Sequence, residues 1–195
     1  MGELIGLLAG CVGMVQAIPQ VRQIRSLGHG RGVNLTSWVL TLVVQASWLG
    51  YGTRIDSPAV LITNAAGGVL AAAVVIALVH NPKIWAGALL LAALAVASIV
   101  QLVPAGPLSI YLVTLTAARA PQALESYRNF RHARATAVSL TSLYFMATSL
   151  VLWEVFALME HRGLMLVTTS LALALTVAIA GLEIGAGKRH VRLAA

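Results

Sequence analysis

The two halves of this chain carry the same ordered set of residues. Pro-Gln occurs at Pro19-Gln20 and again at Pro121-Gln122, each time inside an apolar segment and before an arginine-rich stretch. A Leu-Thr-Ser tripeptide and a tryptophan follow in both copies, at 35–37 and Trp48, and at 140–142 and Trp153. The offset is 102 residues at Pro-Gln and 105 residues at the tryptophans. A repeat of this kind makes each copy one structural unit, and in a membrane protein it is typical of a transporter with its site between the halves.

Composition places the chain in a membrane. Hydrophobic residues are 59% of the chain, charged residues are 10%, and the mean hydropathy is +0.88. Soluble domains have roughly 45–50% apolar and about 25% charged residues, whereas a hydrocarbon layer of ~30 Å requires apolar runs of about 20 residues. Division at charges and at Pro/Gly clusters predicts seven spans, at 4–24, 34–52, 58–79, 83–103, 107–127, 137–158 and 164–184.

These spans predict an all-α membrane protein with seven transmembrane helices in a 3+1+3 arrangement. Each repeat supplies three spans, and the remaining span reverses the chain so that both repeats have the same orientation. We therefore expect two parallel triple-helix bundles joined by a connector helix. The predicted boundaries are 1–80 for the first bundle, 81–104 for the connector, 105–187 for the second bundle and 188–195 for a basic cytoplasmic tail.

The basic residues between the spans predict the orientation. One side has only Arg54 and Arg162, and the other side has ten basic residues: Arg22, Arg25, Arg31, Lys83, Arg128, Arg131, Arg134, Lys188, Arg189 and Arg192. The positive-inside rule then places the N-terminus outside and the C-terminus inside. The net charge of +7 is spread over short loops, which argues against nucleic acid as a partner. The abundance of Ala, Val, Leu, Gly and Arg favours a GC-rich bacterial source and its plasma membrane.

Other classes of protein find no support in the sequence. The N-terminal stretch has Glu3 and no basic region, so no cleavable signal peptide is expected. Cys11 is the single cysteine, which excludes an intramolecular disulfide and a thiolate metal site. We find no nucleophile–base motif, phosphate-binding glycine loop or metal-ligand cluster, so neither an enzyme nor a cofactor is expected.

Proline at equivalent places in both repeats predicts paired breaks in two helices. Pro19 and Pro121 lack an N–H and clash with the preceding turn, so each should kink its helix in the inner half. The amides of Gln20 and Gln122 can satisfy the carbonyls that a kink frees. Either each proline is a structural kink, or the pair is a gating hinge. The occurrence of Pro-Gln at equivalent places in both repeats favours the hinge.

The ordered motifs resemble the PQ-loop superfamily, and most closely the SWEET and SemiSWEET (MtN3/saliva) sugar transporters. The resemblance covers essentially the whole chain and rests on Pro-Gln in spans one and five, Gly32, Ser37-Trp38, residues 48–52, residues 58–64 and Gly67-Gly68. It implies a seven-helix uniporter that moves sugar by facilitated diffusion with alternating access. It also implies a central cavity lined by an asparagine on the third helix of each bundle and a tryptophan on the second.

Carried onto this chain, the resemblance makes Trp48 and Asn64 solute-binding residues. An aromatic face stacks on the C–H face of a pyranose, and an amide bonds to its hydroxyls. In the second repeat Trp153 matches, but Thr169 stands where the asparagine is expected, which favours a smaller or different solute. Ser47, beside Trp48, is a further candidate. Taken alone, an asparagine can serve helix packing and a tryptophan can belong to the interfacial belt.

Two charges inside predicted spans keep other functions open. Arg119 lies two residues before Pro121, where the first repeat has Ala17, and Glu154 follows Trp153. Ionisable groups at such depth mark a pathway or a buried partner. If both face the cavity, they fit a proton-coupled amino-acid transporter, which is the alternative to a sugar uniporter. Simpler roles are a salt bridge from Arg119 to Glu183 or Glu125, its snorkelling to the inner face, and contact of Glu154 with water.

A third possibility is a receptor or scaffold that does not transport. The expected partners are a small-molecule solute and the lipid bilayer, with a homo-oligomer left open.

Overall fold

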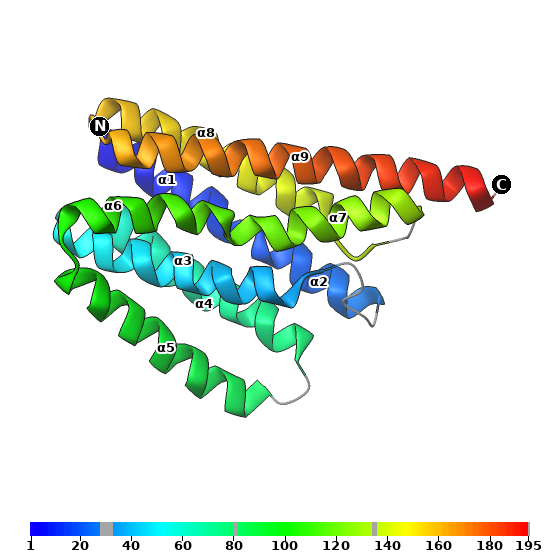
Figure 1. Ribbon diagram of the computed structural model, residues 1–195, viewed down its shortest axis with the longest axis horizontal. Helices are drawn as coiled ribbons and strands as arrows, with labels where there is room; N and C mark the ends of the chain where they lie inside the picture. The colour runs from blue at the N-terminus through cyan, green and yellow to red at the C-terminus, as the bar shows by residue number, and fades with distance from the viewer. Residues whose placement is uncertain (28–32, 80–81, 134–135, 195) are drawn as a thin grey trace.

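The computed structural model describes residues 1–27, 33–79, 82–133 and 136–194, and every regular element in these ranges is helical (Figure 1). The elements are α1 (Gly2–Val15), α2 (Ala17–Leu27), α3 (Leu35–Arg54), α4 (Pro58–Leu78), α5 (Pro82–Leu102), α6 (Ala105–Thr114), the 3-10 helix η1 (Leu115–Arg119), α7 (Ala120–His132), α8 (Leu140–Met159) and α9 (Gly163–Ala194). The all-α prediction is confirmed for the described residues. Helix α9 continues to Ala194 and so includes most of the predicted basic tail that begins at residue 188.

Successive helical passes run in opposite directions along the long axis of the molecule (Figure 1). The passes are α1–α2, α3, α4, α5, α6–η1–α7, α8 and α9. Among the described residues, four segments are long and apolar enough to cross a membrane: Gly2–Ile24, Pro58–Leu78, Leu140–Met159 and Gly163–Lys188. The chain therefore has the helices of a membrane protein.

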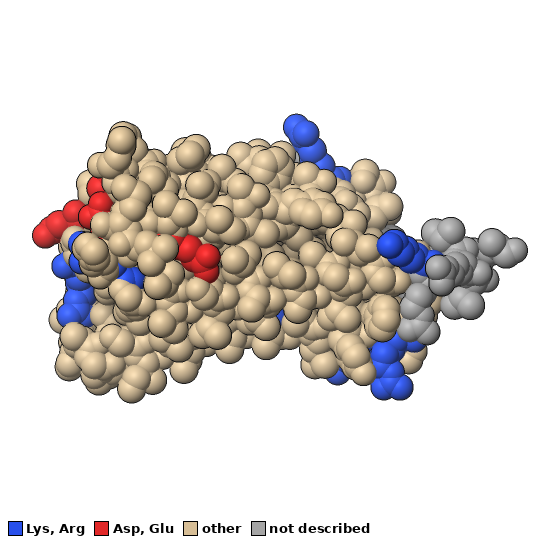
Figure 2. Space-filling view, turned by 90° about the horizontal axis from the view of Figure 1, so that it is seen from above, with Lys and Arg blue, Asp and Glu red and all other residues tan. Residues whose placement is uncertain are grey.

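The surface has an apolar middle and charged ends. Figure 2 shows Lys, Arg, Asp and Glu gathered mainly at the two ends, with uncharged residues between them. We call the end where α2 and α7 finish the arginine-rich end. Arg31 and Arg134 lie outside the described residues, as do the side chains of Arg25, Lys83, Arg189 and Arg192. Large apolar side chains are exposed along the middle, among them Val69, Leu90, Leu91 and Ile110.

The packing order of the helices is the same in both halves. In the first half α4 packs against both α1 and α3, and in the second half α9 packs against both α7 and α8. The halves meet where α1 packs against α8 and where α3 packs against η1 and α7. Helix α5 packs mainly on α3, at the outside of this assembly (Figure 1).

Helices α3 and α8 begin in the same way, 105 residues apart. The side chain of Asn34 caps α3 by accepting from the N–H of Ser37, and the side chain of Ser139 caps α8 by accepting from the N–H of Ser142. Such caps satisfy one of the N–H groups left free at a helix start. The Leu-Thr-Ser repeat therefore marks equivalent first turns.

The two helices also end in the same way. Asp56 after α3 and His161 after α8 have positive φ, 49° and 52°, which is the left-handed conformation that commonly closes a helix. Equivalent backbone bonds complete each turn, from Ser57 N–H to the Gly52 carbonyl and from Arg162 N–H to the Ala157 carbonyl. The repeat seen in the sequence is thus present in the backbone.

Both Pro-Gln helices are interrupted next to the proline. Helix α1 ends at Val15, four residues before Pro19, and α6 gives way to η1 before Pro121. A proline nitrogen cannot donate to the carbonyl four residues earlier. In the second half that carbonyl, of Ala117, accepts instead from the N–H of Ala120, which is the tighter 3-10 pattern. The predicted breaks are present in both halves.

Small residues allow α1 to approach its neighbours closely. A Cβ on Gly10 would lie 2.0 Å from Cγ2 of Thr63 on α4, and one on Gly13 would lie 2.6 Å from Oγ of Ser149 on α8. Stripes of small residues have this role in membrane helices.

We predict that Gly10→Ala destabilises the fold, because the new methyl group overlaps Thr63. Overpacking of this kind costs typically about 1–3 kcal/mol. The matched control is Gly87→Ala on α5, where a Cβ meets nothing within 4 Å and helix propensity favours alanine. Thermal unfolding in detergent should show a lower melting temperature for the first variant alone. Equal melting temperatures for both variants would contradict the close approach.

Candidate functional site

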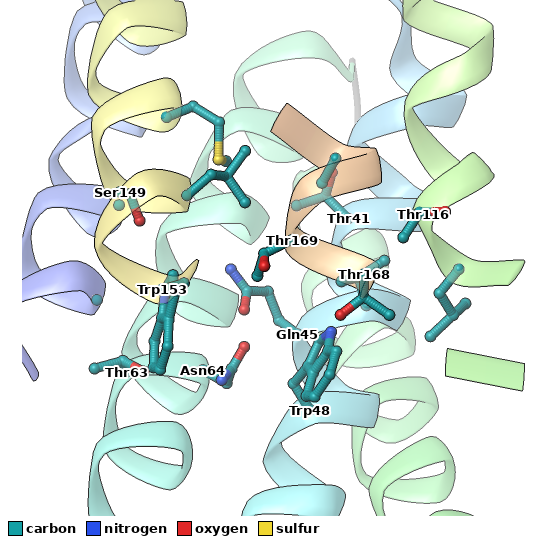
Figure 3. A pocket seen from close by; sticks show the side chains of 18 of the residues that line it. Thr41, Gln45, Trp48, Thr63, Asn64, Thr116, Ser149, Trp153, Thr168 and Thr169 are labelled. Atoms are coloured by element: carbon teal, nitrogen blue, oxygen red, sulfur yellow. The ribbon is translucent and has the colours of Figure 1, made fainter. Parts of the chain in front are cut away.

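A cavity of about 160 Å³ lies where the two halves meet. Its polar lining comes from α3, α4, η1, α8 and α9 (Figure 3), and includes Thr41, Gln45, Asn64, Thr116, Ser149, Thr168 and Thr169. We call it the central cavity. Pockets for drug-sized ligands measure roughly 300–1,000 Å³, so this cavity fits a small solute.

The structure brings together four of the predicted solute-binding residues. Trp48 of α3, Asn64 of α4, Trp153 of α8 and Thr169 of α9 all line the central cavity (Figure 3). Each half therefore contributes one indole from its second long helix and one polar side chain from its third.

Each indole is held in place by an aromatic ring of its own helix. The rings of Trp48 and Tyr51 have centroids 5.4 Å apart with an interplanar angle of 88°, and those of Trp153 and Phe156 are 5.3 Å apart at 89°. This edge-to-face arrangement is favourable. It also restricts both tryptophans without using their hydrogen-bonding groups.

The polar groups near the tryptophans are partly occupied by their own helices. Asn64 Nδ2 donates to the Val60 carbonyl at 2.7 Å, and Thr169 Oγ1 donates to the Met165 carbonyl at 2.8 Å. A hydroxyl has one hydrogen and two lone pairs, and an asparagine amide has two hydrogens and an acceptor oxygen. Asn64 keeps its oxygen and one hydrogen free of these bonds, and Thr169 keeps lone pairs. The cavity therefore has free hydrogen-bond acceptors and a free amide donor beside the two indoles.

Gln45 also lines the cavity, although from the sequence Ser47 is the stronger candidate of the two. Its amide packs over α4, because a Cβ on Gly67 would lie 2.6 Å from Gln45 Nε2. Thr41, Gln45 and Trp48 follow one another at four and three residues, which puts them on one face of α3. That spacing, measured from Trp48, is the signal that identifies Gln45.

Ser47 lies outside the cavity lining, contrary to its proposed role in solute binding. Its side chain is fully buried, and its hydroxyl contacts the Val43 carbonyl at 2.7 Å and the Tyr111 hydroxyl at 2.8 Å. It joins α3 to α6 rather than facing a solute.

Arg119 and Glu154, the two charges considered for the cavity, lie in different surroundings. Arg119 lines the central cavity. Glu154 is not part of that lining, and its carboxylate accepts from Ser170 Oγ at 2.7 Å across the α8–α9 contact. Of these two residues, Arg119 lines the cavity and Glu154 does not.

A second, smaller cavity of about 50 Å³ adjoins the first on the side of the arginine-rich end. It is bordered by the first turns of α3 and α8 and by the Pro-Gln segments. Four residues line both cavities: Gln16, Thr41, Arg119 and Met146. These residues mark the junction between them.

Hydrogen bonds cross between the halves beside this second cavity. Ser37 Oγ donates to the Ala118 carbonyl at 2.9 Å, and Ser142 Oγ donates to the Gln16 carbonyl at 2.5 Å. Each accepting carbonyl lies three residues before the proline of its own helix. The serine of each Leu-Thr-Ser therefore bonds to the interrupted helix of the opposite half. We call this pair the crossed serine bonds.

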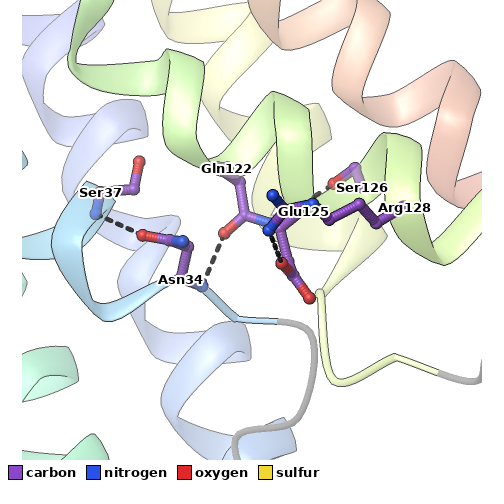
Figure 4. Close-up of polar contacts among 6 residues, drawn as sticks. All are labelled: Asn34, Ser37, Gln122, Glu125, Ser126 and Arg128. Atoms are coloured by element: carbon purple, nitrogen blue, oxygen red, sulfur yellow. Dashed lines mark hydrogen bonds and ion pairs between the residues drawn. The ribbon is translucent and has the colours of Figure 1, made fainter.

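The Pro-Gln glutamine of the second half adds a further link. Gln122 Oε1 accepts from the backbone N–H of Asn34 at 3.0 Å, and Gln122 Nε2 contacts Ser126 Oγ at 3.3 Å (Figure 4). Gln122 thus ties α7 to the start of α3. The side chain of Gln20, its counterpart in the first half, lies outside the described side chains.

The opposite end of the central cavity is bordered mainly by apolar side chains. Val60, Phe156, Ala157 and Met165 form a buried cluster, against which Tyr51, Trp48 and Trp153 pack. Beside it the Glu3 carboxylate accepts from Ser57 Oγ and from the Ala59 N–H, both at 2.9 Å. The cavity thus has packed side chains at one end and the crossed serine bonds at the other.

In the parts of the chain that the structure describes, no group of three or more His, Cys, Asp or Glu residues is placed to hold a metal ion. No protein-family model matches the chain, and a search of curated proteins gives no significant match.

We predict that the double variant Ser37→Ala/Ser142→Ala loosens the arginine-rich end. The variant removes one buried and one partly buried hydrogen bond. At about 0.5–1.5 kcal/mol each, their loss would shift the equilibrium between the closed and open states of this end several-fold. The probe is Met146→Cys in a Cys11→Ala background, since Cys11 is exposed. The rate of modification by a polar thiol reagent should rise.

The control for that experiment is Ser109→Ala, because the hydroxyl of Ser109 bonds only within α6, to the Ala105 carbonyl. Modification as slow in the double variant as in the control would show that the crossed serine bonds do not close this end.

Proposed function

We propose that this protein is a membrane transporter of the PQ-loop/SWEET type. It moves a small polar solute, most favourably a sugar, by facilitated diffusion with alternating access. The observation that carries the proposal is the central cavity. It lies between two halves of equal packing order and is lined by Trp48, Asn64, Trp153 and Thr169.

The proposal includes seven membrane crossings in a 3+1+3 arrangement, with the N-terminus outside. The four long apolar segments and the alternating direction of the passes support it. Helix α3 carries the cavity residues Thr41 and Gln45, which lower its apolar character but do not face lipid in this arrangement. The arginine-rich end is then the cytoplasmic end.

The chemistry of the cavity favours a sugar. Two indole faces can stack on the C–H faces of a pyranose ring. The free oxygen of Asn64 and the lone pairs of Thr169 accept from solute hydroxyls, and the amide of Gln45 can donate to them. The cavity volume of about 160 Å³ favours a single ring over a disaccharide.

The mechanism we propose is a rocking of one half against the other around the cavity. Interrupted helices bend more easily than continuous ones because they lack part of the backbone ladder. Opening toward the cytoplasm breaks the crossed serine bonds, and opening toward the outside separates the buried cluster that contains Val60, Phe156 and Met165. Bent segments beside Pro19 and Pro121 absorb the change.

Proton coupling is the second candidate, and Glu183 is the observation that favours it. This carboxylate is buried, with Oε2 accepting from Thr136 Oγ1 at 2.7 Å, and Oε1 has no hydrogen-bond partner among the residues that the structure describes. Carboxylates inside a transmembrane bundle commonly form the proton relays of pumps and transporters. Exchange that depends on pH in the wild type, and not in Glu183→Gln, would place the protein among proton-coupled transporters.

The proposed function is tested by counterflow of labelled sugars in proteoliposomes. We expect Asn64→Ala to lower exchange at least about tenfold, since the loss of a polar partner leaves solute hydroxyls unpaired in the cavity. Ser109→Ala, outside the cavity lining, should keep wild-type exchange. Normal exchange by Asn64→Ala would refute the assignment of the site.

A separate prediction concerns the prolines. The variant Pro19→Ala/Pro121→Ala restores two backbone N–H donors, so both helices should become more continuous. We expect slower exchange with unchanged solute affinity, measured as the rate and the half-saturation of counterflow. If the exchange rate is unaltered, the prolines are structural kinks and not hinges.

A further inference from the structure

Arg119 is a positive charge at the junction of the two cavities, on the route between the central cavity and the arginine-rich end. It is the last residue of η1 and lines both cavities. Its side chain makes no hydrogen bond or ion pair with any residue that the structure describes. A cation inside a membrane protein is costly and normally faces a partner or a pathway.

The acidic residues that are candidates for pairing with Arg119 are engaged elsewhere. Glu125 lies 3.7 Å from Arg128, Glu154 accepts from Ser170, and Glu183 accepts from Thr136. Figure 4 shows the first of these pairs on α7, beside Gln122. A structural salt bridge therefore does not account for Arg119.

The charge is also absent from the other half. The residue two before Pro19 is Ala17, which is buried, whereas the residue two before Pro121 is Arg119. The backbone break is present in both halves, so a cation is not needed to form it. Arg119 thus adds to the shared scaffold a property that only one half has.

We propose, on the basis of the transport function above, that the solute carries an acidic group which Arg119 binds. The solute class is a small polyhydroxylated acid, such as a sugar acid, rather than a neutral sugar. Its ring and hydroxyls occupy the space between Trp48, Trp153 and Asn64, and its carboxylate reaches toward the junction. The neutral polar lining of the central cavity supplies the hydroxyl contacts.

Physical chemistry supports an anionic group at this place. A guanidinium offers a planar fork of N–H donors that matches a carboxylate in two parallel hydrogen bonds. The pair is strong where water is scarce, because the local dielectric constant is low. The same charge repels cationic solutes that enter the route. This repulsion also favours an anionic solute.

The test compares glucuronate with glucose, two sugars that differ in a carboxylate in place of a hydroxymethyl group. Counterflow of each is measured in proteoliposomes for the wild type, Arg119→Gln and Arg119→Lys. Arg128→Gln is the matched control, because Arg128 is an exposed arginine on α7 outside both cavities. Binding of each sugar is measured in detergent from the fluorescence of the tryptophans.

We expect the wild type to prefer glucuronate by about tenfold or more, the range of one charge-assisted bidentate pair. Arg119→Gln should lose this preference, because exchange of glucuronate falls much more than exchange of glucose. Arg119→Lys should still prefer glucuronate, and Arg128→Gln should match the wild type for both sugars. Binding should show the same order.

Two results would overturn the inference, and they differ in what else they overturn. Exchange of glucose without preference for glucuronate, unchanged in Arg119→Gln, removes the acidic solute and leaves the transport function standing. Absence of exchange and of a fluorescence response for both sugars, in folded wild-type protein, removes the proposed sugar-transport function and this inference together.

Discussion

A proline inside an apolar helix leaves a backbone carbonyl without its usual donor, and a lipid layer has no water to supply one. This constraint shapes the interface between the two halves. In each half the helix is interrupted before Pro-Gln, and a carbonyl in the broken turn accepts from a serine of the other half. The donors, Ser37 and Ser142, are themselves fixed in the capped first turns of α3 and α8. The break and the contact between halves therefore occupy the same turn of each interrupted helix.

The sequence is sufficient to predict the helices, the repeat and the breaks. Periodic apolar runs, Pro-Gln and Leu-Thr-Ser are local signals, and local signals determine helix limits and caps. It also indicates Trp48, Asn64, Trp153 and Thr169, since a resemblance carries positions from one chain to another. All four line the central cavity.

Other features depend on which face of a helix meets which neighbour, and local signals do not contain this information. Ser47 stands next to Trp48 in sequence, but successive residues on a helix point about 100° apart, and Ser47 meets Tyr111 instead. Gln45 reaches the cavity because Gly67 on α4 leaves room for it. Glu154 follows Trp153 and for the same geometric reason bonds to Ser170.

In the proposed transporter, two similar halves with different cavity residues suit an asymmetric solute. The residues 105 positions after Asn64 and Gln45 are Thr169 and Leu150, and all four line the cavity. Both halves supply an indole and an interrupted helix. The side chains that differ between equivalent positions make the two sides of the cavity unequal in polarity. A solute with different groups at its two ends fits this difference better than a symmetric one.

Access to the central cavity from both sides of the membrane is the most direct test of the account. A cysteine in place of Thr168, in a Cys11→Ala background, is exposed in proteoliposomes to an impermeant thiol reagent added on either side. The account predicts modification from both sides and protection from both by the transported solute. Modification from one side only, or modification that no solute slows, would contradict alternating access through this cavity.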